Sequence, residues 1–235
     1  MTPETPAVHA VDLTRTYGTG ARAVRSVDHV SISVPHGEVV AVVGPSGSGK
    51  STLLFLLAGL EQPDTGTVRL TGVDWATLEG RARAAFRRRT CGFVAQGSGL
   101  LPQATAAENV EVPLLLDGVD PAERERRVGA ALARVGLAGH ATKLPDQLSG
   151  GEQQRVAIAR ALIAEPAVVL ADEPTGSLDS VTAQEVTRLL VGAARDLATA
   201  VVLVTHDPAV AAHADRVIEL RSGRVADGAA KRVSP

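Results

Sequence analysis

One eight-residue segment limits the fold of this chain more than any other. It runs from Gly44 to Ser51 with the sequence GPSGSGKS, after a β-branched run at 39–43 and before apolar residues at helical spacing over 50–60. A glycine-rich loop that opens a helix presents successive backbone N–H groups, an arrangement that binds phosphate. The alternative is a flexible Gly/Ser turn between core elements, and the strand-to-helix placement makes it the weaker interpretation.

The residues at the end of this loop suit a bound nucleotide. Lys50 reaches the terminal phosphates and stabilises their charge, Ser51 offers a hydroxyl to Mg²⁺, and Thr52 lies beside it for the inner phosphates. The expected phosphate-binding residues are Gly44, Pro45, Ser46, Gly47, Ser48, Gly49, Lys50, Ser51 and Thr52.

Two carboxylates follow a second apolar strand. The run 168–171 ends in Asp172-Glu173 and is stopped by a proline. Ligands of open α/β sheets lie at the carboxyl ends of strands, so both side chains are expected at the nucleotide. Asp172 would hold Mg²⁺ and Glu173 would act as general base on the attacking water. A solvated acidic turn is the alternative.

A second helix start carries two glycines. Ser149 and Glu152 have capping-box spacing, with Gly150 and Gly151 between them. Each glycine costs up to about 1 kcal/mol relative to alanine in a helix. If this segment were only a helix start, the two glycines would not be needed. Their presence favours the interpretation that their exposed backbone amides bind an anion.

Apolar strands alternate with helical segments along the chain, which predicts a mainly parallel α/β sheet on a P-loop NTPase core. Period-2 patterning at 8–13 and 27–34 predicts an N-terminal antiparallel β subdomain. The stretch 102–165 has no convincing strand and is expected to be an inserted α-helical subdomain. We therefore expect one domain over 1–235, with a core of 1–101 and 166–235. The further expected strands are 92–95 and 201–204, and the expected helices are 79–89, 121–135, 152–164 and 180–197.

The composition of the chain limits which classes of partner and which cellular compartment are expected. A net charge of −2, a pI near 6.3 and 2% aromatic residues argue against nucleic acid. Cys91 is the only cysteine, which favours a reducing compartment, the cytoplasm. No signal-peptide pattern is present, and apolar stretches such as 53–60 are shorter than the roughly 20 residues of a bilayer span. Any membrane role is expected to come through a partner.

In their order along the chain, these motifs resemble the ATP-binding cassette (ABC) ATPases, and the resemblance covers nearly the whole sequence. LSGGE followed by Gln153-Gln154-Arg155 is the most specific element. The strings ADEPTGSLDS and VTHDP look like those of the lipoprotein-releasing, macrolide-efflux and FtsE-type group. The matching elements are Gly44 to Ser51, Gln96, Leu148 to Glu152, Asp172-Glu173, Ser177-Leu178-Asp179 and His206.

The resemblance implies a RecA-like core and an ATP sandwich. In it, two cassettes pair head to tail, and Ser149, Gly150 and Gly151 of one copy cover the nucleotide on the phosphate loop of the other. Catalysis then requires a dimer.

Roles for single residues are implied in the same way. Tyr17 resembles the residue that stacks on adenine, unless it is only a turn aromatic. Gln96 resembles the residue that senses Mg²⁺ and the attacking water, unless it is an ordinary loop glutamine. His206 would contact the γ-phosphate and position the water, and Asp179 would communicate between the two sites. The remaining histidines, His9, His29, His36, His140 and His213, are assigned no role.

The expected function is that of an ATPase subunit, peripheral on the cytoplasmic face of the membrane, that binds ATP and Mg²⁺ and drives integral-membrane permease subunits to export or extract a substrate. An FtsE-like ATPase that transmits force without a cargo is the alternative. A soluble nucleic-acid or translation ATPase is a third, which the near-neutral charge disfavours.

The sequence departs from the family pattern in two places. Ser177 stands where this group usually has asparagine, and Gly97-Ser98-Gly99 is smaller than the residues that the family generally carries there. Neither departure removes a catalytic group. A more flexible loop at 97–99 must be ordered when it contacts a membrane partner.

Overall fold

A parallel sheet forms the centre of the protein, whose computed structural model describes residues 5–226 and 231–232. Its strands lie in the order β9-β3-β8-β7-β6, and the short strands β10 and β11 pair antiparallel with β9. The bounds are β3 (Val39–Val43), β6 (Cys91–Val94), β7 (Val168–Asp172), β8 (Ala200–Val204), β9 (Arg216–Arg221), β10 (Arg224–Val225) and β11 (Lys231–Arg232).

Alternate residues of the central strands face opposite sides of the sheet and enter two separate cores. In β3, Val39 and Ala41 pack with the helices of one side, whereas Val40 and Val42 pack with the elements of the other. All four side chains are fully buried. Burial on both faces is the reason that these strands are continuously apolar in sequence.

An antiparallel sheet covers one side of the centre. Its order is β2-β1-β4-β5, formed by β1 (Val8–Tyr17), β2 (Val24–Val34), β4 (Thr65–Leu70) and β5 (Val73–Asp74), with a 3-10 turn η1 (Gly20–Arg22) between β1 and β2. Helix α1 (Lys50–Leu57) contacts strands of both sheets, and its buried leucines belong to the core between them. The first residue of α1 is therefore placed by packing on two sides.

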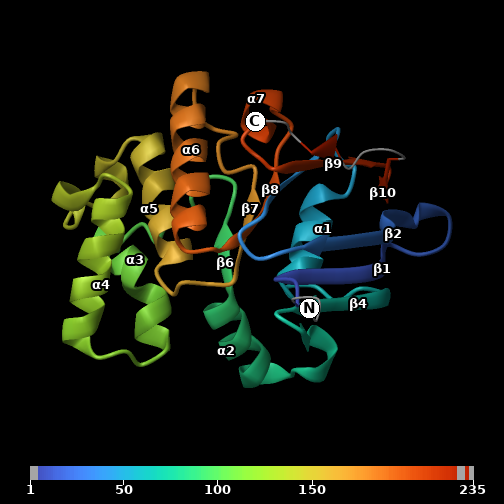
Figure 1. Cartoon of the computed structure of the whole chain (residues 1–235), viewed down its shortest axis with the longest axis horizontal. Coiled ribbons are helices and arrows are strands. Elements are labelled where there is room, and N and C mark those ends of the chain that lie inside the picture. The colour runs from blue at the N-terminus through green and yellow to red at the C-terminus, as the bar shows by residue number, and fades with distance from the viewer. Residues whose placement is uncertain (1–4, 227–230, 233–235) are drawn as a thin grey trace.

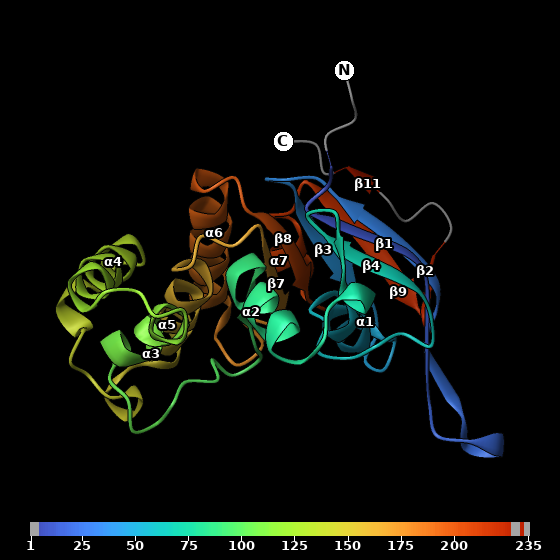
Figure 2. The ribbon, with the colours of Figure 1, turned by 90° about the horizontal axis from the view of Figure 1, so that it is seen from below.

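Helices cover the other side and extend away from the sheet (Figure 1). Figure 2 shows α3, α4 and α5 at one end of the molecule and β1, β2 and β4 at the other. The described chain between β6 and β7 contains helices and turns without a strand. No helix in the described part has the length and apolar composition that crossing a membrane requires. The remaining elements are η2 (Trp75–Thr77), α2 (Gly80–Thr90), α3 (Ala106–Leu116), α4 (Pro121–Arg134), η3 (Ala138–His140), η4 (Pro145–Gln147), α5 (Gly150–Leu162), α6 (Ser180–Asp196) and α7 (Pro208–Ala211).

The expected fold class is confirmed: a mainly parallel sheet, an antiparallel β subdomain and a helical insertion. The subdomain limits at 102 and 165 stay a prediction. The sequence-based expectation lacks the helix α3 and the strands β4 and β9, as well as α7 and the two-residue strands β5, β10 and β11.

Helix α5 lies directly against β6, and a glycine makes this possible. A Cβ added at Gly92 would lie 2.3 Å from the carbonyl oxygen of Ala161 in α5. A backbone oxygen at that distance cannot turn away as a side chain could. Since α5 begins at the Ser149-Gly150-Gly151 turn, this contact also helps to place that turn.

We expect Gly92→Ala to lower the free energy of unfolding by about 2 to 3 kcal/mol, because the methyl group overlaps backbone and forces α5 off the strand. Urea denaturation measures this change. Gly129→Ala is the matched control, because Gly129 lies within α4 with no atom within 4 Å of an added Cβ. That variant should gain about 0.5 to 1 kcal/mol. Equal stability of the two variants would contradict the packing argument.

Candidate active site

The loop between β3 and α1 passes very close to two other strands. A Cβ added at Gly44 would lie 2.1 Å from the carbonyl oxygen of Leu220, and one at Gly49 would lie 1.9 Å from that of Ser26. Gly49 also has a φ of 99°, in the region that favours glycine, directly before the first helical residue. Both positions therefore require glycine for close approach, and Gly49 for its backbone conformation as well.

Polar groups of the same loop are held inside it. The Lys50 Nζ donates to the carbonyl oxygens of Gly44 at 2.9 Å and Pro45 at 3.0 Å, and Lys50 is 7% exposed. The Ser48 Oγ is buried without a hydrogen-bond partner among the described residues. A loop that holds both an unpartnered buried hydroxyl and a buried ammonium fits a site for an anion.

The carboxyl ends of β6, β7 and β8 meet at the loop, because parallel strands all end at the same edge of the sheet. Gln96 follows β6, Glu173 follows β7 and His206 follows β8. A cavity of about 590 Å³ opens there. Its lining residues are Ser26, Ser46, Gly47, Gly49, Lys50, Ser51, Thr52, Gln96, Glu173 and His206.

Asp172 lies at the end of β7 beneath this cavity and is 9% exposed. The Ser51 Oγ donates to its Oδ1 at 3.1 Å. Burial raises the pKa of Asp172 above its ordinary value, and the Glu173 charge raises it further against the opposing effects of Ser51 and Lys50. The buried carboxylate thus lacks sufficient positive charge around it, which a cation would supply.

Glu173 and His206 form a pair beside the phosphate loop. The His206 Nδ1 lies 2.6 Å from the Glu173 Oε2, and the histidine side chain is 68% exposed whereas that of Glu173 is 17% exposed. Glu173 has a φ of 46°, which is unusual for a residue with a side chain. Its backbone N–H donates to the carbonyl of Val204 at 3.0 Å, which ties it to β8.

The turn at the start of α5 lies outside the cavity. It carries the expected capping box, in which the Ser149 Oγ accepts from the Glu152 N–H at 3.3 Å and the Glu152 carboxylate accepts from the Ser149 N–H at 2.7 Å. A Cβ added at Gly151 would lie 2.6 Å from the Thr182 Cγ2, so this turn packs against the start of α6. The amides of Gly150 and Gly151 have no acceptor within the helix.

Asp179 caps α6 at that contact. Its Oδ1 accepts from the N–H groups of Val181 and Thr182, each at 3.1 Å, and its Oδ2 accepts from the Thr182 hydroxyl at 2.6 Å. These hydrogen bonds, the one from the Thr182 hydroxyl first, lower the pKa of Asp179. Asp179 is therefore a structural cap in the single chain.

Tyr17 lies at the end of β1 and does not line the cavity. The Arg15 Cζ lies 5.0 Å from the centroid of its ring, and its hydroxyl donates to Glu61. The residue is 37% exposed. Arg15 occupies one face of the ring.

The structure thus brings together the residues expected from the phosphate loop and the strand ends. It leaves Tyr17, Asp179 and the turn of Ser149, Gly150 and Gly151 outside that cavity. Ser26 lines the cavity without having been expected, since a serine within a strand carries no local signal of a ligand.

Comparison with known proteins agrees with this geometry. The model of the ABC transporter family matches residues 27–176. The lipoprotein-releasing system ATP-binding protein LolD of Chromohalobacter salexigens is 48% identical over 92% of this chain and 92% of its own length. The macrolide export ATP-binding/permease protein MacB of Rhodospirillum rubrum is 47% identical over 94% of this chain, which spans only 34% of that protein.

A solved structure is similar over nearly the whole fold. It is the dimeric post-hydrolysis state of the ATP-binding cassette MJ0796 bound to ADP and Pi, with 38% identity and a TM-score of 0.87. The match covers 97% of this chain and 99% of that one.

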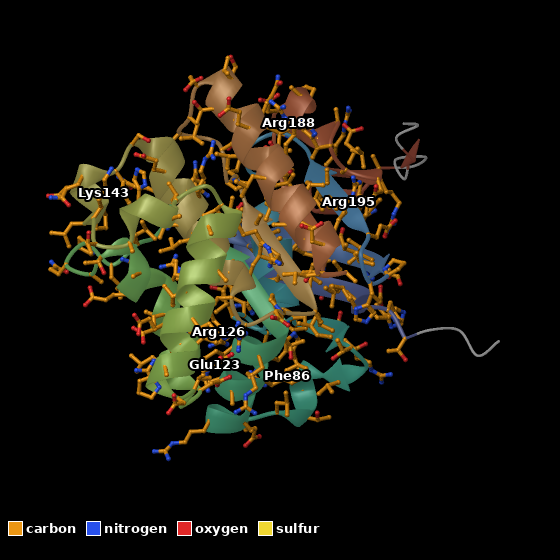
Figure 3. The ribbon with its side chains drawn as sticks, turned by 60° about the vertical axis from the view of Figure 1, so that its left-hand side comes forward. Phe86, Glu123, Arg126, Lys143, Arg188 and Arg195 are labelled. Atoms are coloured by element: carbon orange, nitrogen blue, oxygen red, sulfur yellow. The ribbon has the colours of Figure 1, made fainter. Side chains whose placement is uncertain are left out.

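Lys50→Ala should weaken ATP binding by about tenfold to a hundredfold, because a charge-assisted contact to the phosphates is lost. Isothermal titration calorimetry measures the affinity. Arg188→Ala is the control, since Arg188 lies on α6 with its guanidinium bonded to the Gln184 carbonyl of the same helix (Figure 3). Unchanged ATP affinity in Lys50→Ala would contradict the assignment of the loop.

Proposed function

The chain belongs to the ABC transporter family as an ATP-binding cassette that hydrolyses ATP, and on that premise we propose that two copies close head to tail around the nucleotide. The observation that carries the proposal is the separation of two phosphate-binding surfaces in one chain. Lys50 and the strand ends line a cavity, whereas the open amides after Ser149 lie elsewhere. A second copy turned by half a revolution would bring the two surfaces together.

Closing and opening of this pair of cassettes would drive the movement of the membrane subunits. ATP bridges both surfaces and favours the closed pair, whereas hydrolysis removes the bridge and favours the open one. Membrane subunits attached to the two copies are moved by that difference in affinity.

The oxygen-bearing side chains of Ser51, Gln96 and Asp172 fit Mg²⁺. The Ser51 hydroxyl and the Asp172 carboxylate lie together at 3.1 Å, and Gln96 lines the same cavity. Mg²⁺ prefers such donors and keeps its other positions for phosphate and water. When bound, it neutralises charge on the phosphates, and its charge would favour ionised Asp172. We assign Ser51, Gln96 and Asp172 to hold it.

Glu173 is assigned as the general base and His206 as its partner. The Glu173 side chain is largely buried and lines the cavity beside the phosphate loop, where its carboxylate would polarise the attacking water. Because the His206 Nδ1 contacts Glu173, its Nε2 is left for the γ-phosphate. Lys50 and the helix N-terminus stabilise the charge on the transferred group.

Two residues complete the assignment. Adenine would stack on the face of the Tyr17 ring opposite Arg15, which leaves the guanidinium and the base on either side of one aromatic ring. Asp179 communicates between the sites, since its helix cap contacts the turn that would cover the nucleotide of the other copy.

We propose permease subunits as the membrane partners, with the chain bound peripherally to the cytoplasmic face. The relatives are named for lipoprotein release and for macrolide export. LolD is an ATP-binding protein of this chain's length, whereas MacB carries a permease in the same chain. Export or extraction of a substrate from the membrane is therefore favoured over FtsE-like transmission of force, and no nucleic acid is proposed as a partner.

Glu173→Gln should lower the rate of ATP hydrolysis at least about a hundredfold, because the amide cannot accept the proton of water. ATP should still bind, so the variant should form a stable dimer with ATP. A phosphate-release assay and sedimentation velocity measure the two effects. Hydrolysis at the wild-type rate would exclude Glu173 as the base.

Adding Ser149→Arg to Glu173→Gln tests the closure across two copies. The arginine fills the space over the first-turn amides, so the double variant should stay monomeric with ATP and still bind nucleotide on its own loop. A loss of nucleotide binding by the monomer would mean that Ser149 acts within its own chain.

A tagged chain expressed in its native host should copurify from detergent-solubilised membranes with an integral-membrane subunit. Mass spectrometry identifies that subunit. The same experiment with a catalytically inactive Lys50→Ala chain shows whether recovery of the subunit depends on the ATP cycle. A permease with four spans and a large extracytoplasmic domain would support transport. A short divisome-type subunit would support transmission of force instead, and recovery without any integral-membrane subunit would contradict both.

A further inference from the structure

A histidine that carried no recognisable motif contacts the turn that begins α5. The Nε2 of His140, the last residue of η3, lies 3.0 Å from the Glu152 Oε1. The other oxygen, Oε2, accepts from the Ser149 N–H at 2.7 Å. One carboxylate is therefore held at both of its oxygens, by the cap of its own helix and by a residue from the preceding segment.

The segment that carries His140 is itself fixed in place. The carbonyls of Ala141 and Lys143 accept from the N–H groups of Ala107 at 2.9 Å and Ala106 at 2.8 Å, at the start of α3. Figure 3 shows Lys143 on this loop at the outer end of the helical region. The contact with Glu152 thus comes from a loop anchored to a second helix.

The ring nitrogens of His140 are not equivalent. Its Nδ1 is buried and has no hydrogen-bond partner in the described part of the chain. The Ser149 backbone amide lowers the pKa of Glu152 most and the Ser149 side chain next, and Lys143 and His140 act in the same direction, so the side chain is a carboxylate. A carboxylate only accepts, so a favourable contact at 3.0 Å needs a hydrogen on Nε2.

The capping box of α3 shows what a carboxylate does without such a holder. Thr105 donates both its N–H, at 2.7 Å, and its hydroxyl, at 2.9 Å, to the Glu108 Oε2. In α5 the Ser149 N–H likewise donates to the Glu152 Oε2, and the Ser149 side chain also lowers the pKa of Glu152. The boxes differ at the second carboxylate oxygen, because the Oε1 of Glu152 faces the His140 Nε2 at 3.0 Å.

This difference bears on phosphate binding. A free carboxylate in the first turn is attracted to the positive end of the helix, where the Gly150 and Gly151 amides lie. It would compete with a phosphate for those amides, and its negative charge would repel the phosphate.

We propose that His140 is a positioning residue for the site between two copies: its Nε2–H holds the Glu152 carboxylate aside, so that the first-turn amides stay open to the terminal phosphate of the ATP bound to the other copy. The inference rests on the proposed head-to-tail dimer. In this role His140 acts through Glu152 and not directly on the nucleotide.

The test compares two isosteres in a Glu173→Gln chain, which serves as reference. Glutamine places an amide N–H where histidine has Nε2, and asparagine places it where histidine has Nδ1. His140→Asn should raise the ATP concentration for half-maximal dimerisation about tenfold, since each dimer loses two charge-assisted contacts. His140→Gln should stay within about twofold to threefold of the reference. Sedimentation velocity measures the dimer.

Two controls separate positioning from general damage. ADP affinity of the monomer, measured by calorimetry, should be unchanged in both variants because the phosphate loop is untouched. His36→Asn, at an exposed position in the loop between β2 and β3, should dimerise like the reference.

A double-mutant cycle then links the effect to the carboxylate. With Glu152→Ala in the chain there is nothing to hold, so His140→Asn should cause no further loss of dimerisation. A tenfold loss that persists in the Glu152→Ala chain would overturn the proposal, as would equal impairment of His140→Gln and His140→Asn, or normal dimerisation of His140→Asn. If the reference itself does not dimerise with ATP, the proposed function fails and this inference fails with it.

Discussion

The close passage of the backbone between β3 and α1 is the constraint on which the site depends. Gly44 and Gly49 lie against carbonyl oxygens of Leu220 in β9 and Ser26 in β2, at distances that admit no side chain. These two strands belong to different sheets, so the loop is confined between the parallel and the antiparallel layers. Its amides are therefore positioned by the packing of the whole core, and a ligand needs to order little of the loop when it binds.

The parallel sheet accounts for the rest of the cavity. Three strands end at one edge and place Gln96, Glu173 and His206 beside the loop, although these residues are far apart in sequence. Glu173 adopts a left-handed φ of 46°, a conformation that costs about 1 kcal/mol or more for a residue with a Cβ. Its hydrogen bond to Val204 and its contact with His206 hold it there. The carboxylate proposed as the base is thus fixed by the neighbouring strand.

The elements that sequence alone predicts are those with strong local signals. The buried strands are uninterrupted apolar runs, and the phosphate loop has a fixed spacing, so both were expected in the right places. Helix α3 was not, because Pro113 lies inside it, and β4 was not, because four of its six residues are exposed and its apolar pattern is short. The contact of His140 with Glu152 has no sequence signal, since it depends on how the turns η3 and η4 fold back onto α5.

Within one chain, the proposed hydrolytic carboxylate and the turn proposed to serve the other copy are mechanically connected. The segment after Glu173 leads to Asp179, which caps α6, and the first turn of α6 places Thr182 against Gly151. The gap between them does not admit a methyl group, because an added Cβ at Gly151 would lie 2.6 Å from Thr182. Two turns packed this closely move together rather than past one another. A shift of the segment 173–179 when the γ-phosphate is lost would therefore displace the start of α5, so hydrolysis in one site would weaken the grip on the nucleotide in the other.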